Sequence, residues 1–276
     1  MRAKANAPAD SRALAGWTPR GNGRTGSAST APASGVDSFA PYYDLVHDEC
    51  FGDVFWRLTA DTLALVRQLQ PPPARLLDLG AGTGRLAVPL SLLGYEVLAV
   101  ERSAGMAEML HRRASALGAR PSVRRADFAR EPAASVVAPG VPYDIAIAAF
   151  TVVNYLLSEG ELEALALLVA GSLRRGGCML FDAAERRLFA SATYESKQLH
   201  REIEVTPLAE PLFRYRDSGT GTTDGKRFAY SEEFTFRYWK PDELLSAFRA
   251  AGLRLESEVS HRLRESGSHW FVLRRT

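Results

Sequence analysis

The sequence predicts an α/β fold built around a parallel β-sheet, and three observations support this. Short apolar runs at 75–79, at 96–101 and from 143 up to the loop at Phe150 are typical of buried strands. A helical pattern separates the first two runs, and a glycine-rich turn joins the first run to that helix. With 276 residues, 46% of them hydrophobic, the chain has enough apolar material for one large domain with a well-buried core.

The N-terminal region differs in composition from the rest. Residues 1–36 are rich in Ala, Gly, Ser, Pro and Thr, so we expect a disordered tail; an organellar transit peptide is the alternative that their basic, acid-poor balance leaves open. Helical periodicity starts at 39–47 and becomes clearer over 51–69. The expected organisation is therefore a tail at 1–36, a helical cap at 37–70 and a ligand-binding domain at 71–276.

The turn after the first strand predicts a ligand site. Gly80, Gly82 and Gly84 alternate along it, so a ligand can lie against a backbone that carries no Cβ atoms. A dinucleotide site has a different spacing, G-x-G-x-x-G. Asp78, just before the turn, would repel a pyrophosphate but would accept hydrogen bonds from a cationic amino-acid tail. The turn therefore favours a positively charged ligand.

The second strand, at 96–101, ends in a carboxylate. Glu101 lies about twenty residues beyond the glycine turn, the spacing at which a carboxylate accepts hydrogen bonds from the two ribose hydroxyls. The two segments together predict a nucleoside ligand that carries a cationic tail.

Residues 76–109, which contain these features, resemble the first two motifs of the class I S-adenosylmethionine-dependent methyltransferases. Asp127 and Phe128 match the positions that contact adenine in that family, 143–156 matches its fourth strand and following loop, and 173–182 its Gly-Gly turn and fifth strand. The resemblance covers most of 39–276. It implies a Rossmann-like seven-stranded sheet with helices on both faces, an antiparallel β insertion after the fifth strand, and S-adenosyl-L-methionine as cofactor.

The resemblance also implies a set of cofactor-binding residues. These are Tyr43, Asp78, Gly80, Ala81, Gly82, Glu101, Arg102, Met106, Asp127, Phe128 and Phe150. Tyr43 is expected near the sulfonium, where a phenol suits a cation. Other interpretations stay open: the glycine turn as an ordinary strand-to-helix connection, Asp127 as a turn cap, and Tyr43 as a packing residue.

The C-terminal half contains extended runs at 200–205, 212–216 and 227–238, separated by Gly219, Gly221 and the pair Asp224-Gly225. We expect an antiparallel insertion at about 198–239. Its alternating aromatic residues suit either packing or the lining of an acceptor site. A helix at 241–252 and strands at 253–260 and 269–274 would complete the main sheet.

Methyl transfer depends chiefly on alignment of the nucleophile with the methyl carbon, and a base is needed only if the nucleophile arrives protonated. His47 and His200 are the candidate bases, with Tyr155 and Asn154 as orienting groups. A lone histidine is more often structural or exposed. Asn154 and Tyr155 would alternatively close a turn before a helix that begins near Ser158.

Composition restricts the function further. A net charge of +2 gives no general attraction to nucleic acid, two distant cysteines argue against a disulfide or metal site, and no run of eighteen apolar residues predicts a membrane span. We therefore expect a cytoplasmic enzyme that methylates a nitrogen of a small metabolite or natural product. O- or C-methylation, a non-catalytic cofactor-binding module and a nicotinamide-dependent dehydrogenase are the alternatives. A homo-oligomer through the β insertion or the N-terminal helices is also possible.

Overall fold

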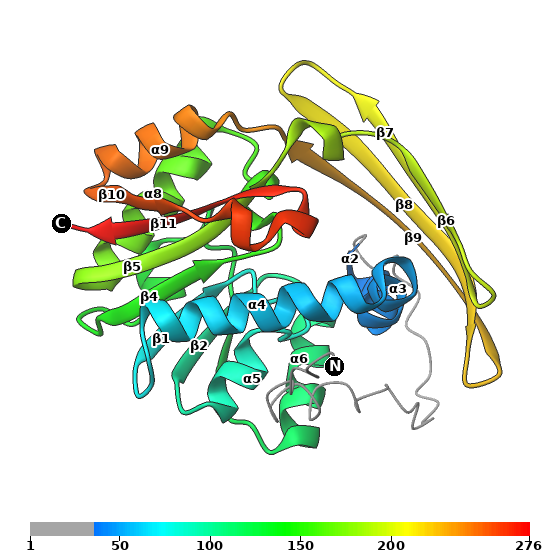
Figure 1. Ribbon diagram of the computed structural model, residues 1–276, viewed down its shortest axis with the longest axis horizontal. Helices are drawn as coiled ribbons and strands as arrows, with labels where there is room; N and C mark the ends of the chain where they lie inside the picture. Colours follow the sequence, from blue (N-terminus) through cyan, green and yellow to red (C-terminus); the bar gives the residue numbers. More distant parts are fainter. Residues whose placement is uncertain (1–35) are drawn as a thin grey trace, which may run out of the picture.

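The computed structural model describes residues 36–276 and arranges them around two β-sheets (Figure 1). Sheet A has seven strands in the order β10-β11-β5-β4-β1-β2-β3. Its strands are β1 (Arg75–Leu79), β2 (Glu96–Glu101), β3 (Ser122–Arg125), β4 (Tyr143–Ala148), β5 (Leu173–Ala184), β10 (Leu253–Glu258) and β11 (Ser268–Arg275). The predicted seven-stranded sheet is confirmed. The predicted N-terminal tail lies, except for its last residue, outside the described residues.

Sheet A is parallel from β3 to β5, and β11 runs antiparallel between β5 and β10. The register pairs Asp78 with Ala99 of β2 and with Ile147 of β4, and pairs Glu101 with Arg125 of β3. The carboxyl ends of these strands therefore meet at one edge of the sheet, which is where open α/β sheets bind ligands.

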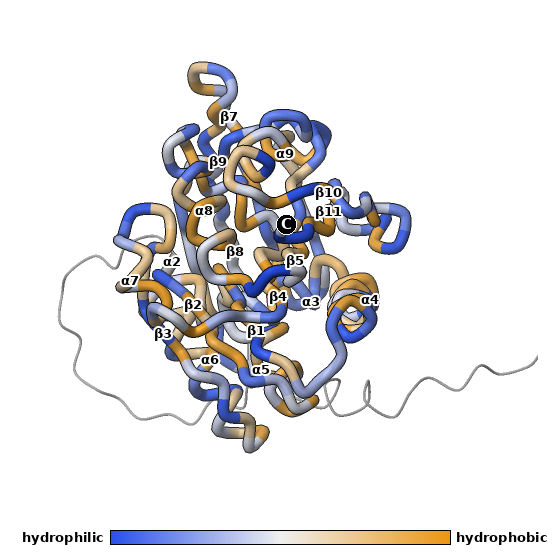
Figure 2. The backbone as a smooth tube through the Cα atoms, turned by 90° about the vertical axis from the view of Figure 1, so that its left-hand side faces the viewer, coloured by the Kyte–Doolittle hydropathy of each residue, from blue (hydrophilic) through white to orange (hydrophobic). Residues whose placement is uncertain are grey.

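Helices cover both faces of sheet A. They are α4 (Asp53–Leu69), α5 (Ala87–Leu92), α6 (Ala104–Leu117), α7 (Ala133–Val136), α8 (Glu159–Ser172) and α9 (Pro241–Ala250). Successive strand residues face opposite ways, so Leu76 packs in the core cluster of α4, α5 and α6, whereas Leu77 packs in the cluster of α8 and α9. Figure 2 shows hydrophobic segments around the central strands and hydrophilic ones at many outer turns.

Sheet B is the antiparallel insertion, with strands in the order β6-β7-β8-β9. These strands are β6 (Ala192–Glu195), β7 (Leu199–Pro207), β8 (Leu212–Thr223) and β9 (Lys226–Arg237). The insertion thus begins earlier than the expected residue 198. Gly219 and Gly221 do not separate strands as predicted; they lie within β8, where a Cβ on either would come within 2.6 Å of the ring of Tyr230 or Phe228. Of the predicted separators, Asp224-Gly225 alone lies between two strands, at the turn from β8 to β9.

The predicted helical cap consists of α2 (Val36–Phe39), η1 (Ala40–Tyr42), α3 (Tyr43–Phe51) and α4. Its first helices pack against sheet B, with Phe39 stacked on Tyr230 at 4.5 Å and Tyr42 on Phe228 at 4.4 Å between ring centroids. The Phe39 amide donates a 2.8 Å hydrogen bond to the Glu232 carboxylate. Sheet B therefore curves over the cap like a roof, as Figure 1 shows; we call sheet B the roof below.

Within residues 36–276, none of the helices combines the length and the apolar character needed to cross a membrane.

Candidate active site

A cavity of about 320 Å³ lies between the carboxyl edge of sheet A, the helical cap and the roof. It contains all eleven predicted cofactor residues in its lining. These are Tyr43, Asp78, Gly80, Ala81, Gly82, Glu101, Arg102, Met106, Asp127, Phe128 and Phe150. Of the four predicted catalytic residues, His47 and Tyr155 line the same cavity. The sequence motifs thus converge on one place, although their individual roles remain predictions.

The glycine turn fits between its neighbours only because it lacks side chains. Gly80, Gly82 and Gly84 have φ values of 74°, 55° and 79°, a region that glycine adopts without steric cost. A Cβ on Gly80 would lie 2.7 Å from a methyl carbon of Val152, and one on Gly84 would lie 2.7 Å from Leu110 Cγ. A Cβ on Gly82 would meet no atom within 4 Å among the described residues. Gly82 is therefore the glycine whose missing side chain leaves room for a ligand.

Two carboxylates flank this turn. Asp78 is 3% exposed, and its Oδ2 atom has no hydrogen-bond partner among the described residues. Burial, reinforced by the nearby Glu101 charge, raises the pKa of Asp78 to about 7. Glu101 accepts hydrogen bonds from the amides of Gly82 and Ser103, each at 2.8 Å, and burial raises its pKa. An orphaned acid oxygen and an open glycine cradle fit a nucleoside with a cationic tail.

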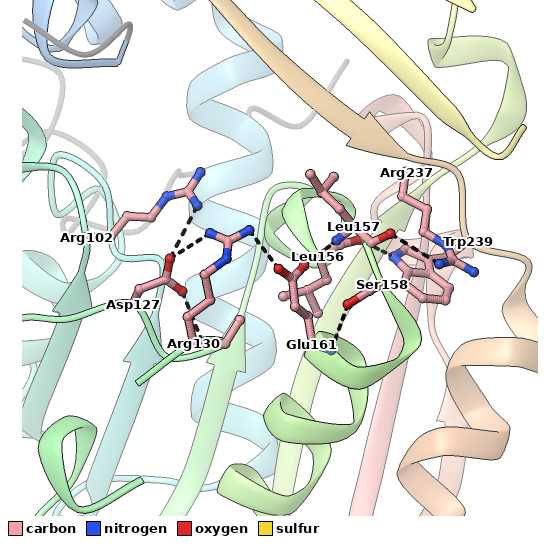
Figure 3. Close-up of polar contacts among 10 residues, drawn as sticks. Arg102, Asp127, Arg130, Leu156, Leu157, Ser158, Glu161, Arg237 and Trp239 are labelled. Atoms are coloured by element: carbon pink, nitrogen blue, oxygen red, sulfur yellow. Dashed lines mark hydrogen bonds and ion pairs between the residues drawn. The ribbon is translucent and has the colours of Figure 1, made fainter. Parts of the chain in front are cut away.

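Asp127 lies at the third strand end and has two roles in the structure. Its Oδ1 accepts the Ala129 amide at 3.1 Å, so it does cap a turn, and its Oδ2 lies 2.9 Å from Arg130 Nη1 and 3.7 Å from Arg102 Nη1. Figure 3 shows Arg130 continuing from this carboxylate to Glu161, at 2.7 Å. The carboxylate still lines the cavity. The turn-cap interpretation and the cavity interpretation are therefore compatible.

The same network extends to the loop that carries Tyr155. Glu161 accepts the Leu157 amide, the Leu157 carbonyl accepts Arg237 Nη1 at 3.2 Å, and the Arg237 guanidinium lies 3.7 Å from the ring centroid of Trp239 (Figure 3). The Trp239 indole in turn donates to the carbonyls of Val153 and Leu156. This loop, between β4 and α8, is thus held from both ends, and the predicted cap Ser158 starts α8 by accepting the Glu161 amide.

A strained turn follows β4 directly. Phe150 and Thr151 have φ values of 67° and 63°, which non-glycine residues rarely adopt. The buried Asp182 on β5 stabilises this turn, because the Thr151 amide donates to both of its carboxylate oxygens at 3.0 and 3.1 Å. Burial raises the pKa of Asp182 to about 6. Strain of this kind is concentrated at functional sites, and no sequence signal indicated it.

Two tyrosines face the cavity together. Tyr43 comes from α3 and Tyr155 from η2 (Val152–Tyr155), and burial raises the pKa of both phenols. Both hydroxyls are therefore protonated at neutral pH. They can donate or accept hydrogen bonds but are poorly suited to remove a proton.

His47 is also poorly suited to act as a base. Its Nδ1 atom lies 2.8 Å from the Tyr43 carbonyl, and burial, with the nearby Arg201 charge, lowers its pKa to about 3. The imidazole is neutral at physiological pH. A general base works best when its pKa lies near the working pH. His47 lines the cavity, but its low pKa makes it a poor base.

Asn154 and His200 do not reach the cavity, contrary to the prediction. Asn154 is fully buried; its Oδ1 accepts the Ala184 amide at 3.0 Å, and its Nδ2 donates to the Arg237 carbonyl at 2.9 Å. His200 is exposed on the outer face of the roof, where its Nδ1 lies 2.5 Å from Glu195. Since strand residues alternate in direction, the next residue of β7, Arg201, is the one that faces inward.

The roof contributes a charged pair that the sequence did not single out, together with some of the aromatic residues expected to line an acceptor site. Arg201 pairs with Asp217 through two hydrogen bonds of 3.0 and 2.6 Å, and both are buried. Among the aromatic residues of the insertion, Tyr215, Phe234 and Phe236 line the cavity. Phe213 instead packs on Phe189, and Phe228 and Tyr230 pack against the helical cap. The inward-facing residues of β7 to β9 thus form one wall of the cavity.

Comparison with known proteins agrees with this arrangement. Residues 76–177 match a family model described as a methyltransferase domain. No curated protein matches the chain. Among solved structures, an S-adenosylmethionine-dependent methyltransferase from Clostridium acetobutylicum is similar, with 14% identity and a TM-score of 0.72 over 84% of this chain and 97% of that one.

Two further structures are similar. The CcbJ methyltransferase from Streptomyces caelestis has 24% identity and a TM-score of 0.69 over 90% of this chain and 100% of that one. The sugar N-methyltransferase KedS8 from Streptoalloteichus has 19% identity and a TM-score of 0.62 over 94% and 99%. At these identities the likeness shows a shared fold. Residues 76–177 of this chain thus match a methyltransferase domain, and the chain as a whole shares the fold of S-adenosylmethionine-dependent methyltransferases.

Proposed function

We propose that the protein methylates a nitrogen atom of a small metabolite or natural product. The observation that carries this proposal is the roof wall of the cavity, where aromatic side chains face the interior and the nearby histidine and tyrosines are poorly suited to remove a proton. The cofactor supplies an electrophilic methyl group on a positively charged sulfur. The rest of the chemistry depends on how the chain holds the nucleophile.

The poor basicity of the histidine and tyrosines in the lining favours nitrogen over oxygen. The roof carboxylates Asp217 and Glu232 are engaged by Arg201 and by the Phe39 amide. His47 has a pKa of about 3, and the pKa values of Tyr43 and Tyr155 are raised. Asp78 has a suitable pKa of about 7, but it lies beside the glycine turn, where we place the amino-acid tail of the cofactor. A hydroxyl nucleophile must lose its proton to react well, whereas an amine that arrives as the free base attacks with its lone pair.

The chain then acts by orientation. In this proposal Asp78, Glu101 and Asp127 hold the tail, ribose and adenine of the cofactor, and the hydroxyls of Tyr43 and Tyr155 lie beside the reacting centre. The roof holds the acceptor in line with the methyl carbon. Alignment of this kind contributes about 7 to 11 kcal/mol to barrier lowering. The proton that the new ammonium carries is lost to water after release.

The roof also supports a small acceptor. Sheet B and the helical cap close over the cavity. The ring of Tyr155 packs edge-on against that of Phe236, with 4.4 Å between ring centroids, and its centroid lies 5.6 Å from that of Phe234. Such a wall suits an acceptor with an apolar or ring-shaped body. KedS8, a sugar N-methyltransferase, has the same fold over nearly its whole length, which supports the choice of a small amine.

We propose a separate role for each of the two expected segments. The helical cap at 37–70 closes the cavity above the cofactor, and the domain at 71–276 binds the cofactor and, through its insertion, the acceptor. A homo-oligomer that uses the insertion or the N-terminal helices is part of the same proposal, and so is a cytoplasmic location.

Methyl-labelled S-adenosylmethionine, incubated with matched panels of small amines and alcohols, tests the function. We expect label in amine products only, with a pH–rate profile that follows the pKa of the acceptor amine and does not change in His47→Ala. Label on oxygen or carbon would replace the proposal by one of its alternatives. Tight cofactor binding without transfer to any acceptor would indicate a non-catalytic module, and nicotinamide binding would indicate a dehydrogenase.

A further inference from the structure

The roof contains a buried ion pair that faces the cavity. Arg201 of β7 and Asp217 of β8 both line the cavity, and only 5% and 4% of their surfaces are exposed. Two hydrogen bonds of 3.0 and 2.6 Å join them, and the Tyr230 hydroxyl donates to Asp217 Oδ1 at 3.1 Å. A buried ion pair adds little net stability, because the loss of hydration offsets the attraction between the charges. The stability of the roof alone therefore does not account for this pair.

The pair lies at the border of the aromatic wall. On the inner face of β9, Tyr230, Glu232 and Phe234 follow one another at alternate positions. Tyr230 stacks on the helical cap, whereas Phe234 lines the cavity. Between these two, Glu232 is paired in register with Asp217 of β8. The charged layer of the roof therefore lies directly beside the aromatic surface that we propose for the body of the acceptor.

Arg201 keeps N–H donors that the pair does not use. Its Nε and Nη2 atoms donate to Asp217. Among residues 36–276, its Nη1 atom has only the thiol of Cys50 as a partner, at 3.7 Å, and sulfur is a weak acceptor. The Asp217 carboxylate accepts three hydrogen bonds from the described residues, out of about four that such a group can accept. The pair therefore offers spare donors beside a carboxylate with spare acceptor capacity.

A hydroxyl group matches this arrangement. It can accept a hydrogen bond from a guanidinium and donate its own proton to the neighbouring carboxylate. An anion is less suitable, because Asp217 already neutralises the charge of Arg201. A purely hydrocarbon ligand would exclude water and leave the remaining donors of a buried guanidinium unpaired, which is costly.

We propose that the Arg201–Asp217 pair binds a hydroxyl group of the acceptor, so that the preferred acceptor is an amine whose ring-shaped or apolar body carries a hydroxyl. This inference rests on the proposed function and names the class of amine within it. The body of the acceptor lies against Tyr215 and Phe234, and its hydroxyl lies on the charged pair. Two fixed points of this kind orient the nitrogen lone pair toward the methyl carbon, as alignment requires.

The test compares acceptors that differ by one hydroxyl group. The full chain is incubated with methyl-labelled S-adenosylmethionine and with cyclohexylamine or one of the positional isomers of aminocyclohexanol. Rates are compared per concentration of free amine, because the hydroxyl group changes the pKa of the amine. For at least one aminocyclohexanol, the wild type should show a kcat/KM about 10- to 100-fold above that for cyclohexylamine, as expected for a hydrogen bond to a charged group.

Two variants remove the hydroxyl site in different ways. Arg201→Met combined with Asp217→Leu replaces the pair by apolar side chains, so that no buried charge is left uncompensated. This double variant should reduce the ratio to about one, whereas its affinity for S-adenosylhomocysteine, measured by calorimetry, should stay within about twofold of wild type. Arg201→Lys keeps the charge but loses the planar fork of donors, so it should retain only part of the ratio.

An exposed pair on the outer face of the same sheet provides the matched control. Arg216 Nη2 lies 3.3 Å from Glu233 Oε2, and both side chains are about half exposed. Arg216→Met combined with Glu233→Leu makes the same chemical change on β8 and β9 without touching the cavity. This control should show the ratio of the wild type.

The outcomes separate this inference from the proposed function. If the wild type methylates these amines with a ratio near one, or if the double variant keeps the wild-type ratio, the inference is overturned and the proposed function stands. An equal loss for all amines in the double variant also overturns it, because the pair then only supports the roof. Should the double variant fail to fold by circular dichroism, an unchanged ratio in Arg201→Lys overturns the inference. If S-adenosylhomocysteine binds but no amine is methylated, the proposed function fails, and this inference fails with it.

Discussion

The two walls of the cavity are built in different ways. The wall that we propose for the cofactor, called the cofactor wall, is local in sequence: its glycine turn and the strand ends at Asp78, Glu101 and Asp127 all lie within one fifty-residue segment of parallel strands. The wall that we propose for the acceptor, called the acceptor wall, is formed by the roof and assembled from distant segments, as in the hydrogen bond from Phe39 to Glu232, which spans 193 residues. The first wall is positioned by backbone geometry, whereas the second depends on side chains packed between sheet B and the helical cap.

The largest expected effect comes from two glycines of the same turn. Gly82→Ala would place a methyl group in open cavity space, so we expect at least about 100-fold weaker binding of S-adenosylhomocysteine, since small displacements of a bound ligand are costly. Gly84→Ala would press on Leu110 at 2.7 Å, so we expect mainly a loss of stability, about 2 to 4 kcal/mol from overpacking and backbone strain.

Calorimetry and thermal unfolding on both variants separate the two effects. Each variant serves as the control for the other, because both introduce an alanine at positive φ. Wild-type affinity in Gly82→Ala would show that the cofactor does not lie over this glycine.

The next effect is a pH dependence at Asp78. Its pKa of about 7 in the unliganded protein lies above that of an unfolded aspartate, so the folded state binds the extra proton and its stability falls as pH rises from about 4 to about 7. Ligand binding has the opposite dependence, because an ammonium needs the ionised acid. The affinity for S-adenosylhomocysteine should fall by up to about tenfold per pH unit below this pKa.

Asp78→Asn should flatten both curves and weaken binding at pH 8 by about 10- to 100-fold. Unfolding free energies and calorimetric affinities between pH 5 and pH 8 provide the measurement. An affinity that is independent of pH in the wild type would place the ammonium elsewhere.

A smaller effect is expected on the acceptor wall. The ring centroid of Phe234 lies 5.3 Å from that of Tyr215, on which it stacks, and 5.0 Å from that of Phe236. Phe234→Ala therefore removes one aromatic surface of this wall. We expect kcat/KM for the acceptor to fall about tenfold while the affinity for S-adenosylhomocysteine stays within about twofold. If both quantities fall together, the two walls are not independent and the comparison fails.

The smallest effect is expected on the outer face of the roof. His200 is exposed, and hydrogen bonding to Glu195 raises its pKa. His200→Ala should therefore leave the pH–rate profile and the thermal unfolding temperature unchanged. If the pH–rate profile of His200→Ala lacks a limb that the wild type shows, His200 is again a candidate base.

Prediction from sequence succeeded where the structure is local. Buried strands, glycine turns and carboxylates at strand ends follow from short patterns, so the seven-stranded sheet was predicted and the cofactor residues lie together in one cavity. The same rules placed Ser158 at the start of α8.

Prediction failed where partners are distant in sequence. Nothing near Asn154 indicates that its amide will join Ala184 to Arg237, and nothing near Arg201 reveals Asp217 as its buried partner. The direction of His200 depended on a strand register that the sequence does not specify. The sequence around Arg85 likewise gives no sign that Phe55 of α4 and Phe150, in the turn after β4, lie on its guanidinium.

Side chains along β7 point alternately out of the roof and into the cavity, and this alternation determines which mutations the protein tolerates. Outward positions such as His200 and Glu202 can vary with little consequence, whereas inward Arg201 and Ile203 contribute to the cavity. A single-codon deletion within β7 would turn every following side chain to the opposite face. New acceptor preferences should therefore arise in this lineage through point substitutions at alternate codons, and insertions should be tolerated mainly at the hairpin ends.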